Sequence, residues 1–180
     1  MNPNNRNNAG RGASFPNFAG LLRQNPQARA QIAGSSAYPD IRGSVIFYQT
    51  SHGVVVAARI MGLPNPGGQC DSPIFAFHIH EGNSCSNSSC RGGVCPQGAD
   101  PFADARMHYN PYDCPHPYHA GDMSPLFGAN GYAFSVFLTD RFTVDEIIGR
   151  TVIIHASPDD FMTQPSGNAG AKIACGVIMR

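Results

Sequence analysis

The sequence contains few charged side chains, and this scarcity narrows the range of functions. Tryptophan is absent, Lys172 is the only lysine, and charged residues make up 13% of the 180 positions. Twelve basic residues balance twelve acidic ones, so the chain has no net field that would attract nucleic acid or an anionic membrane surface. No apolar run approaches the ~18 residues that a membrane-spanning helix requires. We therefore expect neither nucleic acid nor a membrane as a partner.

The first residues lack the apolar segment of a secretory signal. Met1–Arg6 are mostly polar, which favours a cytoplasmic location. Six cysteines point the other way, because structural disulfides belong to oxidising compartments. They are Cys70, Cys85, Cys90, Cys95, Cys114 and Cys175. The alternative is a surface-associated or spore-associated protein that reaches its place by a non-classical route.

Glycine (20 residues) and proline (15 residues) are abundant, which favours short strands joined by long turns over a helical bundle. We expect a disordered Asn/Gly-rich arm over 1–14, a linker or short helix over 15–27, and one domain over 28–180. The expected strands cover 28–33, 43–49, 54–60, 74–80, 151–155 and 173–178, with a hairpin over 126–139 and a helical turn over 143–148. About eight short strands indicate a β-sandwich or barrel.

Histidines are concentrated in one stretch of the chain. Five of the seven lie between residues 74 and 122, His155 is a sixth, and only His52 stands apart. In a strand, His78 and His80 project from the same face and can converge on one ion. His116, His119 and Asp122 are spaced three apart in a loop and can fold around another. Imidazoles suit copper or zinc, and three imidazoles with one carboxylate suit zinc.

Five sequence blocks resemble the copper/zinc superoxide dismutase family, and in particular its bacterial members. They occupy Phe77–Glu81, His108–Pro111, His119–Asp122, Ile148–His155, and Gly167–Gly170 continuing through Ala174–Val177, in the family's order. The resemblance covers about residues 28–178. It implies an all-β fold, an eight-stranded Greek-key β-barrel or immunoglobulin-like sandwich with long metal-binding loops.

The resemblance also implies two metals and a reaction. It assigns copper to His78, His80, His108 and His155, and zinc to His108, His116, His119 and Asp122. His108 would bridge the two metals, and Asp159 would link one copper ligand, His78, to one zinc ligand, His116. The implied reaction converts superoxide to oxygen and hydrogen peroxide. The alternative is a copper- and zinc-binding protein of the same fold with little or no turnover.

Lys172 and the cysteines complete the expectations drawn from the resemblance. Lys172 occupies the position of the family arginine that docks the anion, and lysine lacks the planar fork of arginine, so we expect reduced activity. Cys85 and Cys175 match the family's disulfide. The other four cysteines allow three pairings, which the sequence leaves open. Family members pair through different surfaces, so a homodimer is compatible with the sequence but not specified by it.

Overall fold

The computed structural model describes residues 18–21, 23–68, 73–90 and 96–180. The arm expected over 1–14 lies outside these residues, as do Cys70 and Cys95. The short helix expected within 15–27 is α1 (Phe18–Leu21). None of the helices in the described part of the chain is long and apolar enough to cross a membrane.

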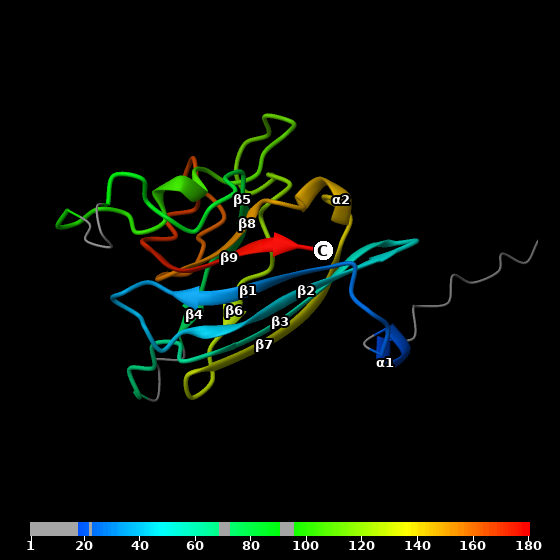
Figure 1. Cartoon of the computed structure of the whole chain (residues 1–180), viewed down its shortest axis with the longest axis horizontal. Coiled ribbons are helices and arrows are strands. Elements are labelled where there is room, and N and C mark those ends of the chain that lie inside the picture. Colours follow the sequence, from blue (N-terminus) through cyan, green and yellow to red (C-terminus); the bar gives the residue numbers. More distant parts are fainter. Residues whose placement is uncertain (1–17, 22, 69–72, 91–95) are drawn as a thin grey trace, which may run out of the picture.

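A curled antiparallel sheet of seven strands forms the body of the described structure (Figure 1). Its order is β5-β8-β9-β1-β2-β3-β7, so the carboxyl-terminal strand β9 lies beside the amino-terminal strand β1. The strands are β1 (Ala28–Gly34), β2 (Arg42–Thr50), β3 (Gly53–Met61), β5 (Phe77–His80), β7 (Tyr132–Thr139), β8 (Thr151–His155) and β9 (Lys172–Met179). The all-β class expected from the sequence is confirmed.

Side-chain alternation explains why one face of the sheet is buried. In β1, Ala28, Ala30 and Ile32 are buried while Arg29 and Gln31 are exposed, as the period of two in a strand requires. Strand β8, in contrast, is buried along its whole length, because it lies between the core and the loops that cover it. The inner faces of the strands form one apolar core that continues to the histidine-bearing strand β5.

Two predictions for the minor elements need correction. The segment expected as one strand over 74–80 is divided at Ala76 into β4 (Ile74–Phe75) and β5, because the Ala76 backbone instead pairs with His155 N and Ser157 O. The turn at Asn130-Gly131 forms, with both residues at positive φ. However, β6 (Leu126–Phe127) pairs with β4 and not with β7, so the expected hairpin over 126–139 is wrong.

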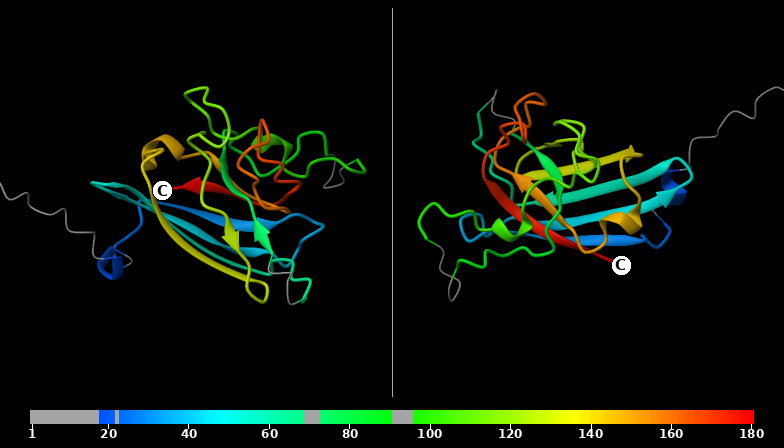
Figure 2. Two further views of the ribbon diagram at one scale, coloured as in Figure 1. Left: turned by 180° about the vertical axis from the view of Figure 1, so that it is seen from behind. Right: turned by 90° about the horizontal axis from the view of Figure 1, so that it is seen from above.

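The longest loops gather on one side of the sheet, above the strands in the left view of Figure 2. They include the long segment after β5, with the 3₁₀ helix η1 (Ala103–Ala105), and the segment between β8 and β9. In the connection between β7 and β8, α2 (Val144–Ile147) is the helical turn expected over 143–148. Its Thr143 and Glu146 form a capping box that satisfies the amide groups at its start. The loop cluster carries three of the seven histidines, namely His108, His116 and His119.

A disulfide between Cys85 and Cys175 ties the long loop to β9. It spans 90 residues, and the Cys175 side chain is packed with Phe102 and Ile153 beneath the loop. Among the other cysteines, Cys90 is disulfide-bonded and Cys114 carries a free thiol. The long loop is thus covalently held against the sheet.

Replacing both members of this disulfide, Cys85→Ser with Cys175→Ser, should lower the free energy of unfolding by about 3–4 kcal/mol, since the bond restricts a long loop in the unfolded chain. Thermal or urea unfolding measures the change. The matched control is Cys114→Ser, which removes a thiol that forms no disulfide. Equal stabilities of the double variant and the control would contradict this role.

Candidate metal centre

The free edge of β5 sets the position of most of the site. Its backbone bonds to two separate loop segments: Ile79 N donates to Gly121 O, and Tyr109 N donates to Ile79 O, both at 2.8 Å. These contacts place Asp122 opposite His78 and His108 opposite His80. Gly121 is required here, because a Cβ at that position would overlap the Ile79 carbonyl. Backbone pairing therefore brings residues from distant parts of the chain into one centre.

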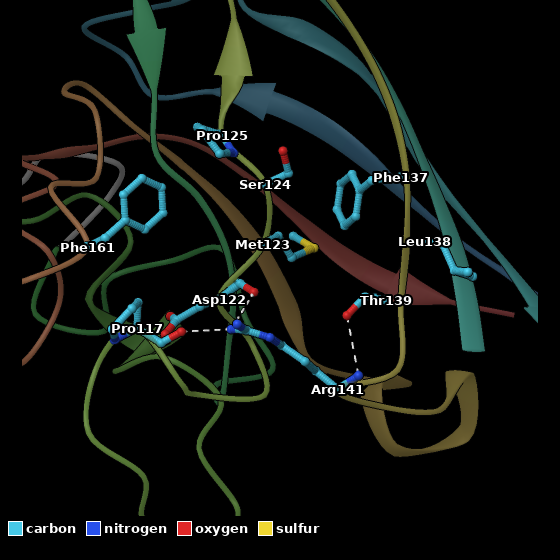
Figure 3. A pocket seen from close by; sticks show the side chains of 10 residues that line it. All are labelled: Pro117, Asp122, Met123, Ser124, Pro125, Phe137, Leu138, Thr139, Arg141 and Phe161. Atoms are coloured by element: carbon cyan, nitrogen blue, oxygen red, sulfur yellow. Dashed lines mark hydrogen bonds between the residues drawn. The ribbon is translucent and has the colours of Figure 1, made fainter. Parts of the chain in front are cut away.

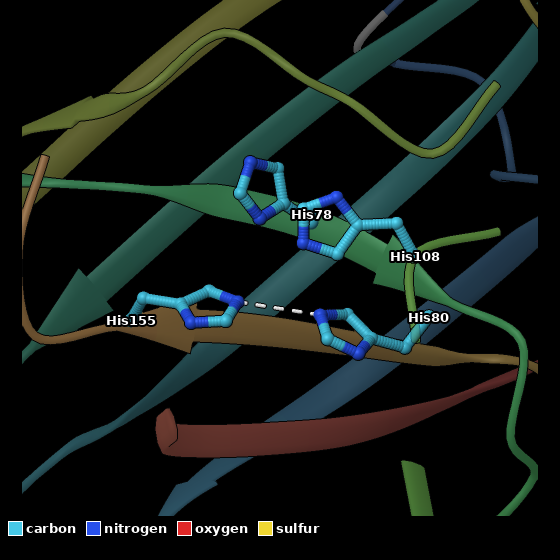
Figure 4. Close-up of side chains that lie close together, drawn as sticks. All are labelled: His78, His80, His108 and His155. Atoms are coloured by element: carbon cyan, nitrogen blue, oxygen red, sulfur yellow. Dashed lines mark hydrogen bonds between the residues drawn. The ribbon is translucent and has the colours of Figure 1, made fainter. Parts of the chain in front are cut away.

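The first group consists of His78, His80, His108 and His155, all buried, and their candidate ligand nitrogens lie within 4.8 Å of one another. Figure 4 shows the four rings converging from β5, from the end of β8 and from the loop that carries His108. His80 Nε2 and His155 Nε2 are 3.3 Å apart. A four-nitrogen imidazole set of this kind suits copper or zinc.

The second group consists of His108, His116, His119 and Asp122, also buried and within the same 4.8 Å limit. Asp122 Oδ2 lies 3.1 Å from His116 Nδ1 and 3.3 Å from His119 Nδ1. The nitrogens of His119 and His108 are 3.4 Å apart. Bonds of ~2.0–2.1 Å in a tetrahedral zinc site separate the donors by about 3.3 Å. The donor set and its spacing therefore fit zinc.

Hydrogen bonds to backbone carbonyls fix two rings of the first group. His80 Nδ1–H donates to Arg106 O at 2.8 Å, and His155 Nδ1–H donates to Gly170 O at 3.2 Å. A carbonyl accepts only, so the proton is on Nδ1 in both rings and the Nε2 lone pair remains available. Both lone pairs can therefore serve as ligands within the group.

The Asp159 carboxylate connects the two groups. Its Oδ2 accepts from His78 Nε2 at 2.8 Å and its Oδ1 accepts from His116 Nε2 at 2.9 Å. Burial opposes its ionisation, but the bonds from His78, the Phe161 amide and His116 together lower its pKa. Gly167 leaves room for it, since a Cβ there would overlap the carboxylate. Asp159 thus turns the Nδ1 atoms of both rings toward the metal groups.

Three buried ring nitrogens test whether a metal fits. Among the described residues, His78 Nδ1, His108 Nε2 and His116 Nδ1 have no hydrogen-bond partner. Orphaned polar atoms are rare in protein interiors, because each one forfeits its contact with water. All three belong to the ligand groups, and a metal ion would satisfy each of them. The residues present therefore fit two metals.

Burial also keeps the imidazoles in the form that binds metal. It lowers the pKa of His78, lowers that of His80 well below its usual range, and lowers that of His155 to about 3. Lys172 is near enough to contribute to the last two shifts. Neutral rings offer lone pairs, so these side chains are ready for a metal at neutral pH.

A pocket of about 440 Å³ opens over the first group. Three of the copper-assigned rings and three charged residues line it, namely His80, His108, His155, Asp100, Arg106 and Lys172. The Lys172 ammonium donates to Asp100 Oδ2 at 2.7 Å and to Phe102 O at 3.1 Å. The structure therefore places Lys172 beside the first group, as the sequence predicts, but also pairs it with an acidic residue.

Arg141 supports the zinc-suited loop, and sequence reasoning missed it. Its Nη1 lies 2.8 Å from Pro117 O, 3.3 Å from His119 O and 3.2 Å from Asp122 O. Figure 3 shows the side chain reaching from beyond β7 toward Pro117 and Asp122, at the edge of a second cavity of about 370 Å³. No local motif marks this arginine, because its partners are backbone atoms distant in sequence.

The geometry first defines a class: an antiparallel β-protein with two adjacent groups of buried metal-ligating side chains that share one imidazole. Comparison with known families then matches residues 41–178 to copper/zinc superoxide dismutase (SODC), and the chain belongs to that family. The family implies copper and zinc, and both groups are able to hold metal.

Individual relatives agree with this assignment. Superoxide dismutase (Cu-Zn) 2 of Aquifex aeolicus is 29% identical over 170 residues, covering 86% of this chain and 88% of that protein. The Cu-Zn enzyme of Photobacterium leiognathi is 35% identical over 146 residues, covering 76% and 78%. Among solved structures, the Brucella abortus Cu/Zn superoxide dismutase has a TM-score of 0.67 at 22% identity, covering 84% of this chain and 99% of that one. This likeness confirms the expected Greek-key β-barrel fold.

Replacing Arg141 with glutamine should weaken zinc binding roughly tenfold, because the loop that carries the ligands loses its anchor. Competition with a chromophoric zinc chelator measures the affinity. Arg59→Gln is the matched control, since Arg59 is exposed on β3, away from the metal groups. An unchanged zinc affinity in Arg141→Gln would show that the loop holds its shape without this contact.

The metal-free protein should lose stability as the pH falls from 6.5 toward about 3. The pKa of His155 is about 3 in the folded protein and 6.5 ordinarily, so in this interval the unfolded chain binds more protons. Melting temperatures measured across the interval should therefore decrease with pH, and less steeply in His155→Gln. A flat profile, or identical slopes for the two proteins, would contradict the burial of a neutral ring.

Proposed function

We propose that the protein converts superoxide to oxygen and hydrogen peroxide. In this proposal His78, His80, His108 and His155 hold copper, and His108, His116, His119 and Asp122 hold zinc. The support comes from family membership, from the fit of the donor groups, and from a pocket that gives small molecules access to the first group.

The position of His108 carries the proposal. Its ring belongs to both groups: Nδ1 lies 2.8 Å from Asp122 Oδ1, and Nε2, on the other side, is buried without a partner. One imidazole that presents a nitrogen to each of two adjacent sites can connect them as a shared ligand. A protein that only stored two metals would not require this shared ring.

Copper would supply one-electron redox chemistry, since it alternates between two oxidation states. The protein side chains supply protons and orientation. Formation of peroxide consumes protons, and His108 Nε2 can hold one at the place where the pocket reaches the first group. The zinc group, of which Asp122 is also a member, would hold the opposite nitrogen, so the ring would keep its orientation while Nε2 gains or loses a proton.

Lys172 is one of the cations that a superoxide anion would meet in the pocket. Its ammonium is in the pocket and close enough to affect the pKa of His80 and His155. Its pairing with Asp100 reduces the positive charge available to a substrate. This pairing favours the second candidate function, a copper- and zinc-binding protein of the same fold with little turnover.

Protein loaded with one copper and one zinc should dismutate superoxide much faster than the spontaneous reaction, with a chelator present to suppress free copper. His108→Gln should lower the rate roughly a hundredfold, because it removes the proton-holding nitrogen. Pulse radiolysis or stopped-flow absorbance measures the rate. His52→Gln is the control, since His52 is exposed in the β2–β3 turn. Full metal occupancy with a rate no better than that of the spontaneous reaction would favour the binding protein.

A further inference from the structure

The pocket over His80, His108 and His155, here called the copper-facing pocket, contains charged residues other than Lys172. Its lining contains three residues charged at neutral pH: Asp100, Arg106 and Lys172. One negative and two positive groups leave a net charge of +1. Either Arg106 or Lys172 can present this positive charge to an incoming anion.

Lys172 is compensated by a carboxylate that the long loop holds in place. Asp100 Oδ1 accepts from Phe102 N at 2.8 Å, which leaves Oδ2 to bind the ammonium at 2.7 Å. The buried Asn87 side chain donates to Asp100 O at 2.7 Å and fixes the backbone as well. Because Asp100 is anchored at both points, its negative charge stays beside Lys172. The pair presents little net charge to the pocket.

Arg106 is the other cation, and its conformation is unusual. The residue is exposed at the pocket, and no hydrogen bond or ion pair of its guanidinium is found within the described residues. Its backbone has φ 63° and ψ −143°, a region that only glycine enters without strain. Arg106 O accepts from His80 Nδ1, so this strained backbone also orients a ring of the first group. A bulky charged residue persists where glycine would be favoured.

We propose that Arg106 is the residue that draws the substrate anion into the copper-facing pocket. The inference rests on the proposed function and deepens it by assigning the docking of the anion to a second cation. The guanidinium supplies the planar fork that Lys172 lacks. Its charge acts on the nearby Asp104 carboxyl, but no ion pair between the two is found within the described residues, and Asp104 accepts hydrogen bonds from Ser86 and Ser88 instead. The ligand class is a small monovalent anion of the size of superoxide or azide.

The strained backbone of Arg106 should lower the stability of the folded protein, and this effect can be tested on metal-free protein. At most positions alanine is more stabilising than glycine, because glycine makes the unfolded chain more flexible. At position 106 the order should reverse, and Arg106→Gly should melt about 2–4 °C above Arg106→Ala. If the alanine variant melted higher, Arg106 would be an unstrained surface residue, and the argument from its conformation would fail.

The deciding experiment is an azide titration of protein loaded with one copper and one zinc, followed by the copper(II) absorption or electron paramagnetic resonance spectrum. Arg106→Gln should weaken azide binding roughly three- to tenfold, as expected for the loss of one nearby charge in a solvated pocket. Arg106→Lys, which keeps the charge without the fork, should fall between Arg106→Gln and the parent protein. Arg29→Gln is the matched control, because it removes the same charge from the outer face of β1.

Asp100→Asn shows whether the titration detects charge in the pocket, since it releases Lys172 and should strengthen azide binding. If Asp100→Asn strengthens binding while Arg106→Gln leaves it unchanged, the role of Arg106 is overturned and the proposed function stands. If Arg29→Gln weakens binding as much as Arg106→Gln, the effect is one of net charge and the assignment also fails. If azide leaves the spectrum of the parent protein unchanged, the copper site is closed to anions, and the proposed function fails together with the role of Arg106.

Discussion

The orientation of the metal-binding rings depends on the two hydrogen bonds that the Asp159 carboxylate accepts from histidines. They hold one ring from each metal group, His78 and His116, and turn the opposite nitrogens of both toward the ligand positions. The carboxylate in turn depends on the Phe161 amide and on the space left by Gly167. Buried imidazoles without such partners would lose their contacts with water and gain nothing in return. One carboxylate therefore gives both sites a defined orientation before any metal arrives.

The other ligands are positioned by the edge strand β5, by Arg141 and by the Cys85–Cys175 disulfide. Strand β5 leaves one edge unpaired by other strands, and the loop segments around His108 and Asp122 bond to it. Arg141 and the Cys85–Cys175 disulfide then hold the loops in place from two sides. Most of the ligands are on irregular segments. Their positions are nevertheless well defined, because the segments around His108 and Asp122 form backbone hydrogen bonds with β5. This arrangement places the pocket lined by His80, His108 and His155 beside the apolar core.

In a chain of which only 13% is charged, three charged residues line one pocket. Two of them, Asp100 and Arg106, belong to the long loop after β5, and the third, Lys172, begins β9. The disulfide that joins the loop to β9 therefore also holds these charges together. Any movement of the loop would change the distances among the three groups, so the tether that stabilises the loop also maintains the charge arrangement of the pocket. The loop after β5 therefore contributes two of the three charged residues that line the pocket.

The sequence by itself determined the class of the fold and the ligand types, because strands and His-rich blocks are local patterns. The spacing of His78 and His80 on a strand is one example, and the turn at Asn130-Gly131 is another. Only the tertiary structure decided the division of the strand at Ala76, the pairing of β6 with β4, and the contacts of Arg141 and Asp100. Each of these depends on atoms far away in sequence, and no local pattern encodes such long-range contacts. For the same reason the sequence alone does not single out Arg106, because its backbone conformation and its place at the pocket exist only in the folded chain.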